Sequence, residues 1–94
     1  MQDGLKNELA DLGRVCGAAR VVLFGPRTRG DNQERSDIDL AIFGLLHSKE
    51  SVFLDGIDAM PTLLRFDIVF ISERTSPELL SEIQRDGVLI YKAT

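Results

Sequence analysis

Three aspartates lie at spacings that could bring their carboxylates to one place. Asp37 and Asp39 are separated by one residue at the start of an apolar run, residues 38–43, that is typical of a strand. Because successive side chains of a strand point to opposite faces, both carboxylates are predicted to project from the same face. Asp67 lies in a second apolar run, residues 66–71, in which both faces are apolar, and this predicts burial on both sides. A carboxylate in such a strand needs a cation or a basic partner.

The spacing of these aspartates allows two interpretations. If the two strands are neighbours, the three carboxylates converge, and Mg²⁺, which prefers oxygen ligands and keeps waters or phosphate oxygens in its shell, would relieve their repulsion. In the alternative, Asp37 caps the preceding loop, Asp39 is solvated at a strand end, and Asp67 pairs with Arg65 or Arg35. An Asp-x-Asp pair is a weak motif when taken singly, so the spacing leaves both interpretations open.

The segment upstream of the aspartates favours the first interpretation. An apolar strand, residues 21–24, runs directly into Gly25, and a second glycine follows at Gly30. Glycines at such a turn let a phosphate approach the backbone closely, and the exposed N–H groups of the loop or of a helix N-terminus then point at the anion. The same loop also carries three arginines, Arg27, Arg29 and Arg35. A strand, a glycine loop and paired carboxylates, in this order, are a specific pattern that favours a metal site with phosphates beside it.

Composition limits the class of protein. The 94 residues suffice for one compact domain, predicted to span residues 1–94, and their 44% hydrophobic content is ordinary for a soluble fold. No apolar run approaches the roughly 20 residues of a membrane span, and no secretory signal precedes the first helix, so a cytoplasmic location is expected. Eleven Lys and Arg against fifteen Asp and Glu give a net charge of -4, which disfavours a nucleic-acid substrate.

The chain alternates helical and strand patterns, which predicts an α/β fold. The expected elements are a helix over residues 3–13 or slightly beyond, strands over 21–24 and 38–43, a helix over 48–60, a strand over 66–71, a helix between 76 and 87, and a strand over 88–91. Ser48 is the expected N-cap of the second helix, and Ser76, followed by Pro77, is that of the third. Gly87 is expected to end that third helix.

Several conspicuous side chains are expected to have structural roles. Cys16 continues the helical stripe of the first helix, and as the only cysteine it is predicted to pack in the core. Phe53, Ile57 and Met60 share one helical face and are expected in the core as well. His47 has no second histidine with which to build a zinc site, so it is interpreted as a loop residue.

Three separated segments together resemble a known family. LFGPRTRG, then SDIDLAIFG, then RFDIVFIS are similar to the DNA polymerase beta-like nucleotidyltransferase superfamily, and in particular to its minimal members, which are encoded beside HEPN-domain proteins. The final segment, SPELLSEIQRDGVLIY, resembles the last helix and strand of these small proteins. The resemblance implies the nucleotidyltransferase fold, an α/β (α+β) arrangement with a small mixed β-sheet and helices packed mainly on one face.

The resemblance also implies roles for the site residues. Asp37 and Asp39 would ligate the metals, and Asp67 would join this metal site and help to activate the acceptor hydroxyl. Two Mg²⁺ ions would stabilise the attacking and leaving oxygens at the α-phosphate of ATP or another nucleoside triphosphate. The nucleotide-binding residues implied in this way are Gly25 and Gly30, which would shape the triphosphate loop, Arg27 and Arg29, which would neutralise phosphate charge, and Ser36, which would order the turn into Asp37.

Pro26 departs from the family pattern. It stands where the family usually places a serine whose hydroxyl and backbone N–H both face a phosphate, and proline supplies neither donor. Each lost hydrogen bond to a charged group costs about 1.5–3 kcal/mol unless a neighbouring donor compensates. Pro26 therefore puts nucleotide affinity and turnover in question.

Two functions from different classes are compatible with the sequence. The first, implied by the family, is transfer of a nucleoside monophosphate, expected to be AMP, to a hydroxyl of a partner protein, with the chain acting as the antitoxin of a HEPN-type toxin. A chain this short has little room to hold an acceptor as well as a nucleotide, so a partner and a homo- or hetero-oligomer are both compatible with it. In the alternative, the domain is a weak or inactive enzyme that inhibits its partner by binding alone.

Overall fold

The computed structural model of the protein describes residues 3–25, 38–62 and 65–93. Their elements, in chain order, are α1 (Asp3–Cys16), β1 (Arg20–Phe24), β2 (Ile38–Phe43), the short 3₁₀ helix η2 (His47–Lys49), α2 (Glu50–Asp58), β3 (Phe66–Phe70), α3 (Pro77–Asp86) and β4 (Val88–Lys92). Every predicted helix and strand is present, and most bounds differ from the predicted ones by a few residues. None of the helices in the described ranges is long and apolar enough to cross a membrane.

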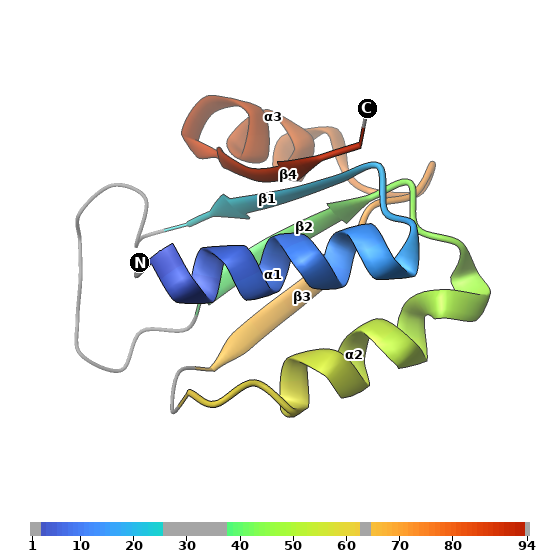
Figure 1. Ribbon diagram of the computed structural model, residues 1–94. Coiled ribbons are helices and arrows are strands. Elements are labelled where there is room, and N and C mark those ends of the chain that lie inside the picture. Colours follow the sequence, from blue (N-terminus) through green and yellow to red (C-terminus); the bar gives the residue numbers. More distant parts are fainter. Residues whose placement is uncertain (1–2, 26–37, 63–64, 94) are drawn as a thin grey trace.

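The four strands form one mixed sheet in the order β3-β2-β1-β4 (Figure 1). β1 pairs antiparallel with β2 on one side and with β4 on the other, whereas β2 and β3 run parallel. The parallel pair needs a crossover, because a parallel strand cannot follow through a tight turn, and η2 and α2 provide it. The small mixed sheet predicted from the resemblance is confirmed.

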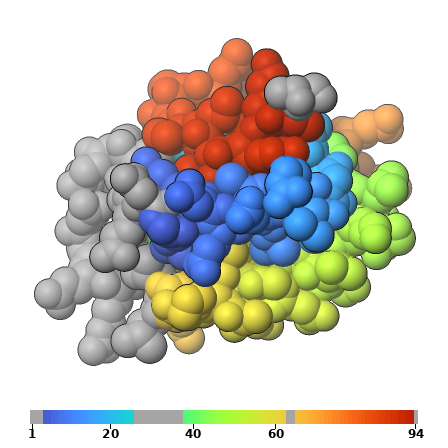
Figure 2. Space-filling view, in the orientation of Figure 1, coloured from blue at the N-terminus to red at the C-terminus, as the bar shows by residue number. Residues whose placement is uncertain are grey.

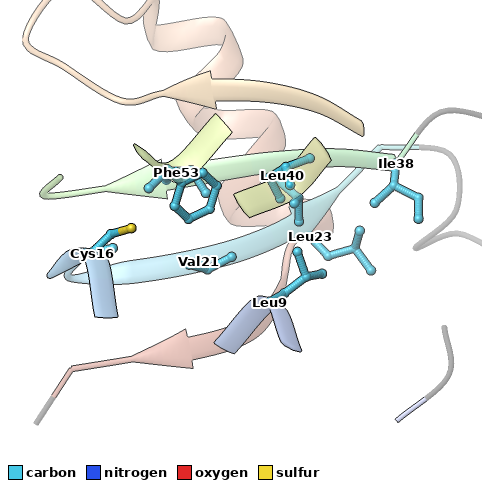
Figure 3. Close-up of a cluster of buried hydrophobic side chains, with 10 residues drawn as sticks. Leu9, Cys16, Val21, Leu23, Ile38, Leu40 and Phe53 are labelled. Atoms are coloured by element: carbon cyan, nitrogen blue, oxygen red, sulfur yellow. The ribbon is translucent and has the colours of Figure 1, made fainter. Parts of the chain in front are cut away.

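Helices cover both faces of this sheet unequally. α1 and α2 lie side by side on one face, and α3 lies on the other, behind β1 and β4 (Figure 1). The larger core lies under α1 and α2, where Leu9, Leu40 and Phe53 are fully buried (Figure 3). A smaller cluster packs α3 against the other face through Val22 and Ile83. Two of the three described helices therefore share a face, as expected.

The predicted core residues of α1 and α2 are confirmed. Cys16 is 5% exposed and, as a free thiol, packs in the larger core. Phe53 and Ile57 are buried in the same core, and Met60 packs against it. The Phe53 ring contacts the Phe70 ring of β3 edge-on, with ring centroids 6.2 Å apart, so α2 packs against the strand that follows it in the chain.

Helix starts show where the sequence prediction was right and where it was wrong. The Ser76 hydroxyl accepts a hydrogen bond from the backbone N–H of Leu79 at 3.2 Å, so Ser76 is the N-cap of α3 as predicted. Ser48 is not the N-cap of α2, because the chain first makes the 3₁₀ turn η2 and Lys49 takes the cap position without a side-chain hydrogen bond. His47, at the start of η2, is exposed and lies 3.2 Å from a carboxylate oxygen of Glu50.

Candidate active site

Two of the three predicted carboxylates lie directly opposite each other in the sheet. Asp39 of β2 and Asp67 of β3 are register partners in the parallel pair, so their side chains project from the same face. Asp39 alternates with Leu40, which is buried under α1 and α2, and shares its face with Ala41, which belongs to the α3 cluster. The carboxylates therefore lie on the face of the sheet opposite α1 and α2.

Gly25 brings the end of β1 against this pair. Asp39 is opposite Phe24 in the antiparallel register, and the chain then turns at Gly25 with φ +89°, a conformation that strongly favours glycine. A Cβ built on Gly25 would collide with Oδ2 of Asp39 and lie 3.2 Å from its Cγ. The close packing of the Asp39 carboxylate over the glycine backbone thus depends on the absence of a side chain. The ends of three neighbouring strands meet here.

Asp67 is more exposed than the sequence predicts. Apolar residues on both faces of its strand predict burial on both sides, but β3 is an edge strand of the sheet and Asp67 is exposed. An edge strand has a neighbour on one side only, and the face that carries Asp67 is not covered by α1 or α2. The predicted burial was therefore wrong, so burial does not by itself require a cation or a basic partner for this carboxylate.

The alternative in which Asp67 pairs with Arg65 has no support in the described residues. No ion pair joins these two side chains, and the backbone carbonyl of Arg65 accepts a hydrogen bond from the N–H of Ile38 at 2.8 Å.

Asp39 is half-buried, and at one end of the sheet it lies between the exposed Asp67 and the glycine turn. These two carboxylates lie side by side, one half-buried and one exposed, and such an anionic pair is suited to bind a hard divalent cation.

The remaining predicted site residues lie outside the described ranges. They are Pro26, Arg27, Arg29, Gly30, Arg35, Ser36 and Asp37. Within the described ranges no group of three or more His, Cys, Asp or Glu side chains is placed to hold a metal ion. The predicted triad includes Asp37, so the described residues contain only two of its three members. These two and the glycine turn fit a divalent cation with a phosphate beside it, because they combine oxygen ligands with a backbone that has no side chain in the way.

One contact in the site could not be predicted from the sequence. The approach of Asp39 to Gly25 joins residues on two different strands, and its only sequence signal is a glycine at a strand end, which is common to many turns. The register of β2 on β3 likewise depends on how the crossover through α2 packs. The sequence pattern indicated which residues to consider, but their juxtaposition came from tertiary packing.

Sequence comparison identifies the family. The profile described as "Polymerase beta, Nucleotidyltransferase" matches residues 16–94, which covers most of the chain. The chain belongs to the polymerase beta nucleotidyltransferase family. The match begins at the last residue of α1, so it includes all four strands of the nucleotidyltransferase sheet. No curated protein matches the chain.

Solved structures share the nucleotidyltransferase fold of this chain. A crystal structure of a toxin–antitoxin with AMP-PNP is similar with a TM-score of 0.67 at 19% identity, covering 95% of this chain and 74% of that one. A mutant of the toxin–antitoxin MntA-HpeT is similar with a TM-score of 0.66 at 16% identity, with the same two coverages, 95% and 74%. A minimal nucleotidyltransferase has a TM-score of 0.63 at 28% identity, covering 90% and 88%. The first two likenesses establish the fold.

Proposed function

We propose that this nucleotidyltransferase-family chain transfers AMP from ATP to a hydroxyl of a partner protein. The observation that carries the proposal is the placement of Asp39 and Asp67 as register partners beside the Gly25 turn. Two carboxylates on neighbouring strands, next to a backbone that a phosphate can approach, are what transfer of a phosphoryl-linked group requires. Membership of the family supports a nucleotide as the donor.

The residues of the chain would divide the chemistry as follows. Asp39, with Asp37 from the preceding loop, would hold Mg²⁺ against the triphosphate, and the ion would neutralise the charge that develops on the phosphate oxygens. Exposed and next to Asp39, Asp67 would face the acceptor hydroxyl and receive its proton. The hydroxyl oxygen would bond to the α-phosphorus while the bond to the bridging oxygen breaks, and pyrophosphate would leave.

The nucleotide would also need donors from the loop that follows Gly25. We propose that Gly30 and the backbone of this loop surround the phosphates, that Arg27 and Arg29 neutralise their charge, and that Ser36 orders the turn into Asp37. This assignment is supported by the sequence pattern and by the glycine turn at the start of the loop.

A partner protein would supply the acceptor. Two of the similar structures are described as toxin–antitoxin structures, one of them with AMP-PNP. By analogy we propose that the partner is a toxin, of the helical HEPN type implied by the sequence resemblance, and that AMP on its hydroxyl neutralises it. The chain would then be the antitoxin of the pair.

Label transfer from ATP tests this proposal. With a HEPN-type protein encoded in the adjacent reading frame, the chain and Mg²⁺ should move label from α-labelled ATP onto the partner and none from γ-labelled ATP. Asp67→Asn should abolish transfer, whereas Glu73→Gln, an exposed acid in the turn after β3, should leave it unchanged. Transfer of the γ-label would identify a kinase reaction instead, and transfer by Asp67→Asn would remove Asp67 from the chemistry.

Replacement of Pro26 separates transfer from inhibition by binding. Pro26→Ser restores a hydroxyl and a backbone N–H that could bind phosphate, and it should raise the transfer rate by about tenfold or more if these donors limit the reaction. If the wild-type chain transfers nothing, Pro26→Ser transfers well, and both neutralise the toxin equally, the natural chain inhibits its partner by occlusion.

A further inference from the structure

A groove of about 320 Å³ lies between α1 and α2, on the face of the molecule shown in Figure 2. Its α1 wall includes Leu12 and Val15, and its α2 wall includes Gly56 and Ala59. α1 (blue) and α2 (yellow-green) run side by side across this view (Figure 2). The two helices pack closely at the floor, because a Cβ on Gly56 would lie 2.5 Å from Cδ1 of Leu12.

The wall of this groove is apolar and open to solvent. Val15 is 70% exposed, the highest value among the large hydrophobic side chains of the described residues. Val52, which is 49% exposed, lies one turn before Gly56 and therefore on the same side of α2. Single exposed apolar side chains are ordinary, but Val15 belongs to a groove lining that is mostly apolar.

The rim of the groove is acidic. Glu8 and Asp11 line it on α1, spaced so that, with Val15, they follow one side of the helix. Asp55, which precedes Gly56 in α2, is exposed but does not line the groove. Arg14 of the same helix as Asp11 lies 3.4 Å from a carboxylate oxygen of Asp11 and offsets part of its charge in an exposed pair. The described lining of the groove contains two carboxylates, Glu8 and Asp11, and no Lys or Arg, which disfavours phosphates of nucleic acid or anionic lipid.

We propose that this α1–α2 groove binds an amphipathic helix of a partner protein, with a narrow apolar stripe and Lys or Arg beside it, facing Glu8 and Asp11 of α1. The apolar walls suit side chains at i, i+3 and i+7 of an inserted helix, which is a recurring mode of peptide recognition. The acidic rim complements basic flanks. A second copy of this chain is disfavoured, because a two-fold interface brings the same patch of both copies together and would set one acidic rim near the other.

The groove is on the opposite face of the sheet from Asp39 and Asp67, so a helix bound there would leave the carboxylates accessible. The groove therefore functions as a docking surface separate from the candidate active site. The inference does not depend on the proposed transfer chemistry, because it rests on the shape and charge of α1 and α2. A partner could thus be held at one face while it is modified at another, or held without modification.

Two synthetic helices serve as probes. Both are stapled peptides with the same leucine stripe at helical spacing, one flanked by lysines and the other by glutamates. The lysine peptide should bind the ¹⁵N-labelled chain and shift the amide signals of Glu8, Asp11, Val15, Gly56 and Ala59. The glutamate peptide should bind at least about fivefold more weakly, because it meets the acidic rim with like charge.

Matched variants locate the binding site. Val15→Lys should weaken binding of the lysine peptide by about tenfold or more, since it removes apolar contact and adds like charge. Leu46→Lys is the control, because Leu46 is 69% exposed, close to the value of Val15, but does not line the groove. The affinity of the Leu46→Lys variant for the lysine peptide should equal that of the wild-type chain. Glu8→Lys should weaken the lysine peptide and strengthen the glutamate peptide, each by about two- to fivefold.

Four results would overturn the proposal. The first two are that the lysine peptide does not bind and that both peptides bind with equal affinity. The third is that the amide signals shift only in β4 or at the carboxylate end of the sheet. The fourth is that Val15→Lys and Leu46→Lys reduce the affinity for the lysine peptide equally. Sedimentation of the chain alone tests whether a second copy of the chain occupies the groove instead. A dimer that dissociates in the Val15→Lys variant would assign the groove to that second copy. Folding of every variant is checked by its melting temperature, so loss of structure cannot mimic loss of binding.

Discussion

At the scale of single residues, Gly25 has two separate constraints that mutation can distinguish. Its φ of +89° disfavours any side chain, and a Cβ there would collide with the Asp39 carboxylate. Gly17 has a similar φ of +83°, but a Cβ there would meet nothing within 4 Å. The two glycines therefore form a matched pair in which only one also contacts the candidate site.

We predict that Gly17→Ala costs about 1–2 kcal/mol of unfolding free energy and that Gly25→Ala costs more. The excess should vanish when Asp39 is also replaced by alanine, which urea unfolding of the double mutant measures. Gly25→Ala should also abolish the rise in melting temperature that Mg²⁺ and ATP give, whereas Gly17→Ala should keep it. Equal costs for both glycines would show that the Asp39 contact contributes nothing.

Asp67 should have opposite effects on stability and on ligand binding. It lies directly opposite Asp39, and like charges in register destabilise a sheet. In EDTA we predict that Asp67→Asn raises the unfolding free energy by a few tenths of a kcal/mol, an increase that high salt should reduce. The same variant should lose part of the stabilisation by Mg²⁺ and ATP, but less than Asp39→Asn loses, because Asp39 would hold the ion and Asp67 would face the acceptor hydroxyl. Differential scanning fluorimetry measures both, with Glu73→Gln as the exposed control, and a full ligand shift in Asp67→Asn would contradict the carboxylate-pair interpretation.

At the scale of elements, the two serines expected to cap helices behave differently. Ser76 accepts the hydrogen bond from the N–H of Leu79, and Pro77 supplies a fixed φ at the first position of α3. Ser48 makes no cap bond, because η2 precedes α2 and shifts the start of that helix. A cap is therefore determined by local sequence only where nothing intervenes between the loop and the helix.

We predict that Ser76→Ala costs about 1 kcal/mol of stability and that Ser48→Ala costs close to nothing. The physical reason is the N–H of Leu79, which Ser76→Ala leaves without its side-chain acceptor, whereas no cap bond is lost at Ser48. Chemical denaturation of both variants checks the difference. A loss at Ser48 as large as at Ser76 would mean that the hydroxyl of Ser48 caps α2 in solution.

At the scale of the whole molecule, α2 is the element that joins the crossover to the sheet. Phe53 is fully buried and contacts Phe70 of β3, the strand that carries Asp67. The edge strand pairs with β2 only, and the contact between Phe53 and Phe70 adds to that pairing. A core contact on the other face of the sheet therefore supports the strand that places Asp67 opposite Asp39.

We predict that Phe53→Ala lowers the unfolding free energy by about 3–5 kcal/mol, a large part of the roughly 5–14 kcal/mol expected for a chain of this length. The neighbouring Leu54 is 41% exposed, and Leu54→Ala should cost less than about 1 kcal/mol. Urea unfolding measures both. If Phe53→Ala were as mild as Leu54→Ala, the core beneath α2 would not be what stabilises β3.

The sequence by itself determined the kinds of elements and most of their limits. Periods of two and 3.6 residues, the Ser76–Pro77 helix start and the glycines at strand ends are local signals, and local signals specify local conformation. The same signals drew attention to Asp39, Asp67 and Gly25 as candidate site residues. They could not bring these residues together, because no property of one segment specifies which segment will lie beside it.

Tertiary structure decided the rest. β3 lies at the edge of the sheet, and this position leaves Asp67 exposed although its apolar neighbours predict burial. Val69 and Ile71, on the face of Asp67, pack against the cluster that includes Ile83 of α3, and the residues of the other face pack against the larger core. The parallel register placed Asp67 opposite Asp39, and the positive φ of Gly25 let the carboxylate approach the backbone. The groove between α1 and α2 likewise exists only once the two helices pack, since its walls come from residues more than 40 positions apart in the chain. Pairings between distant segments depend on packing and loop closure rather than on local preference, and a single sequence does not record them.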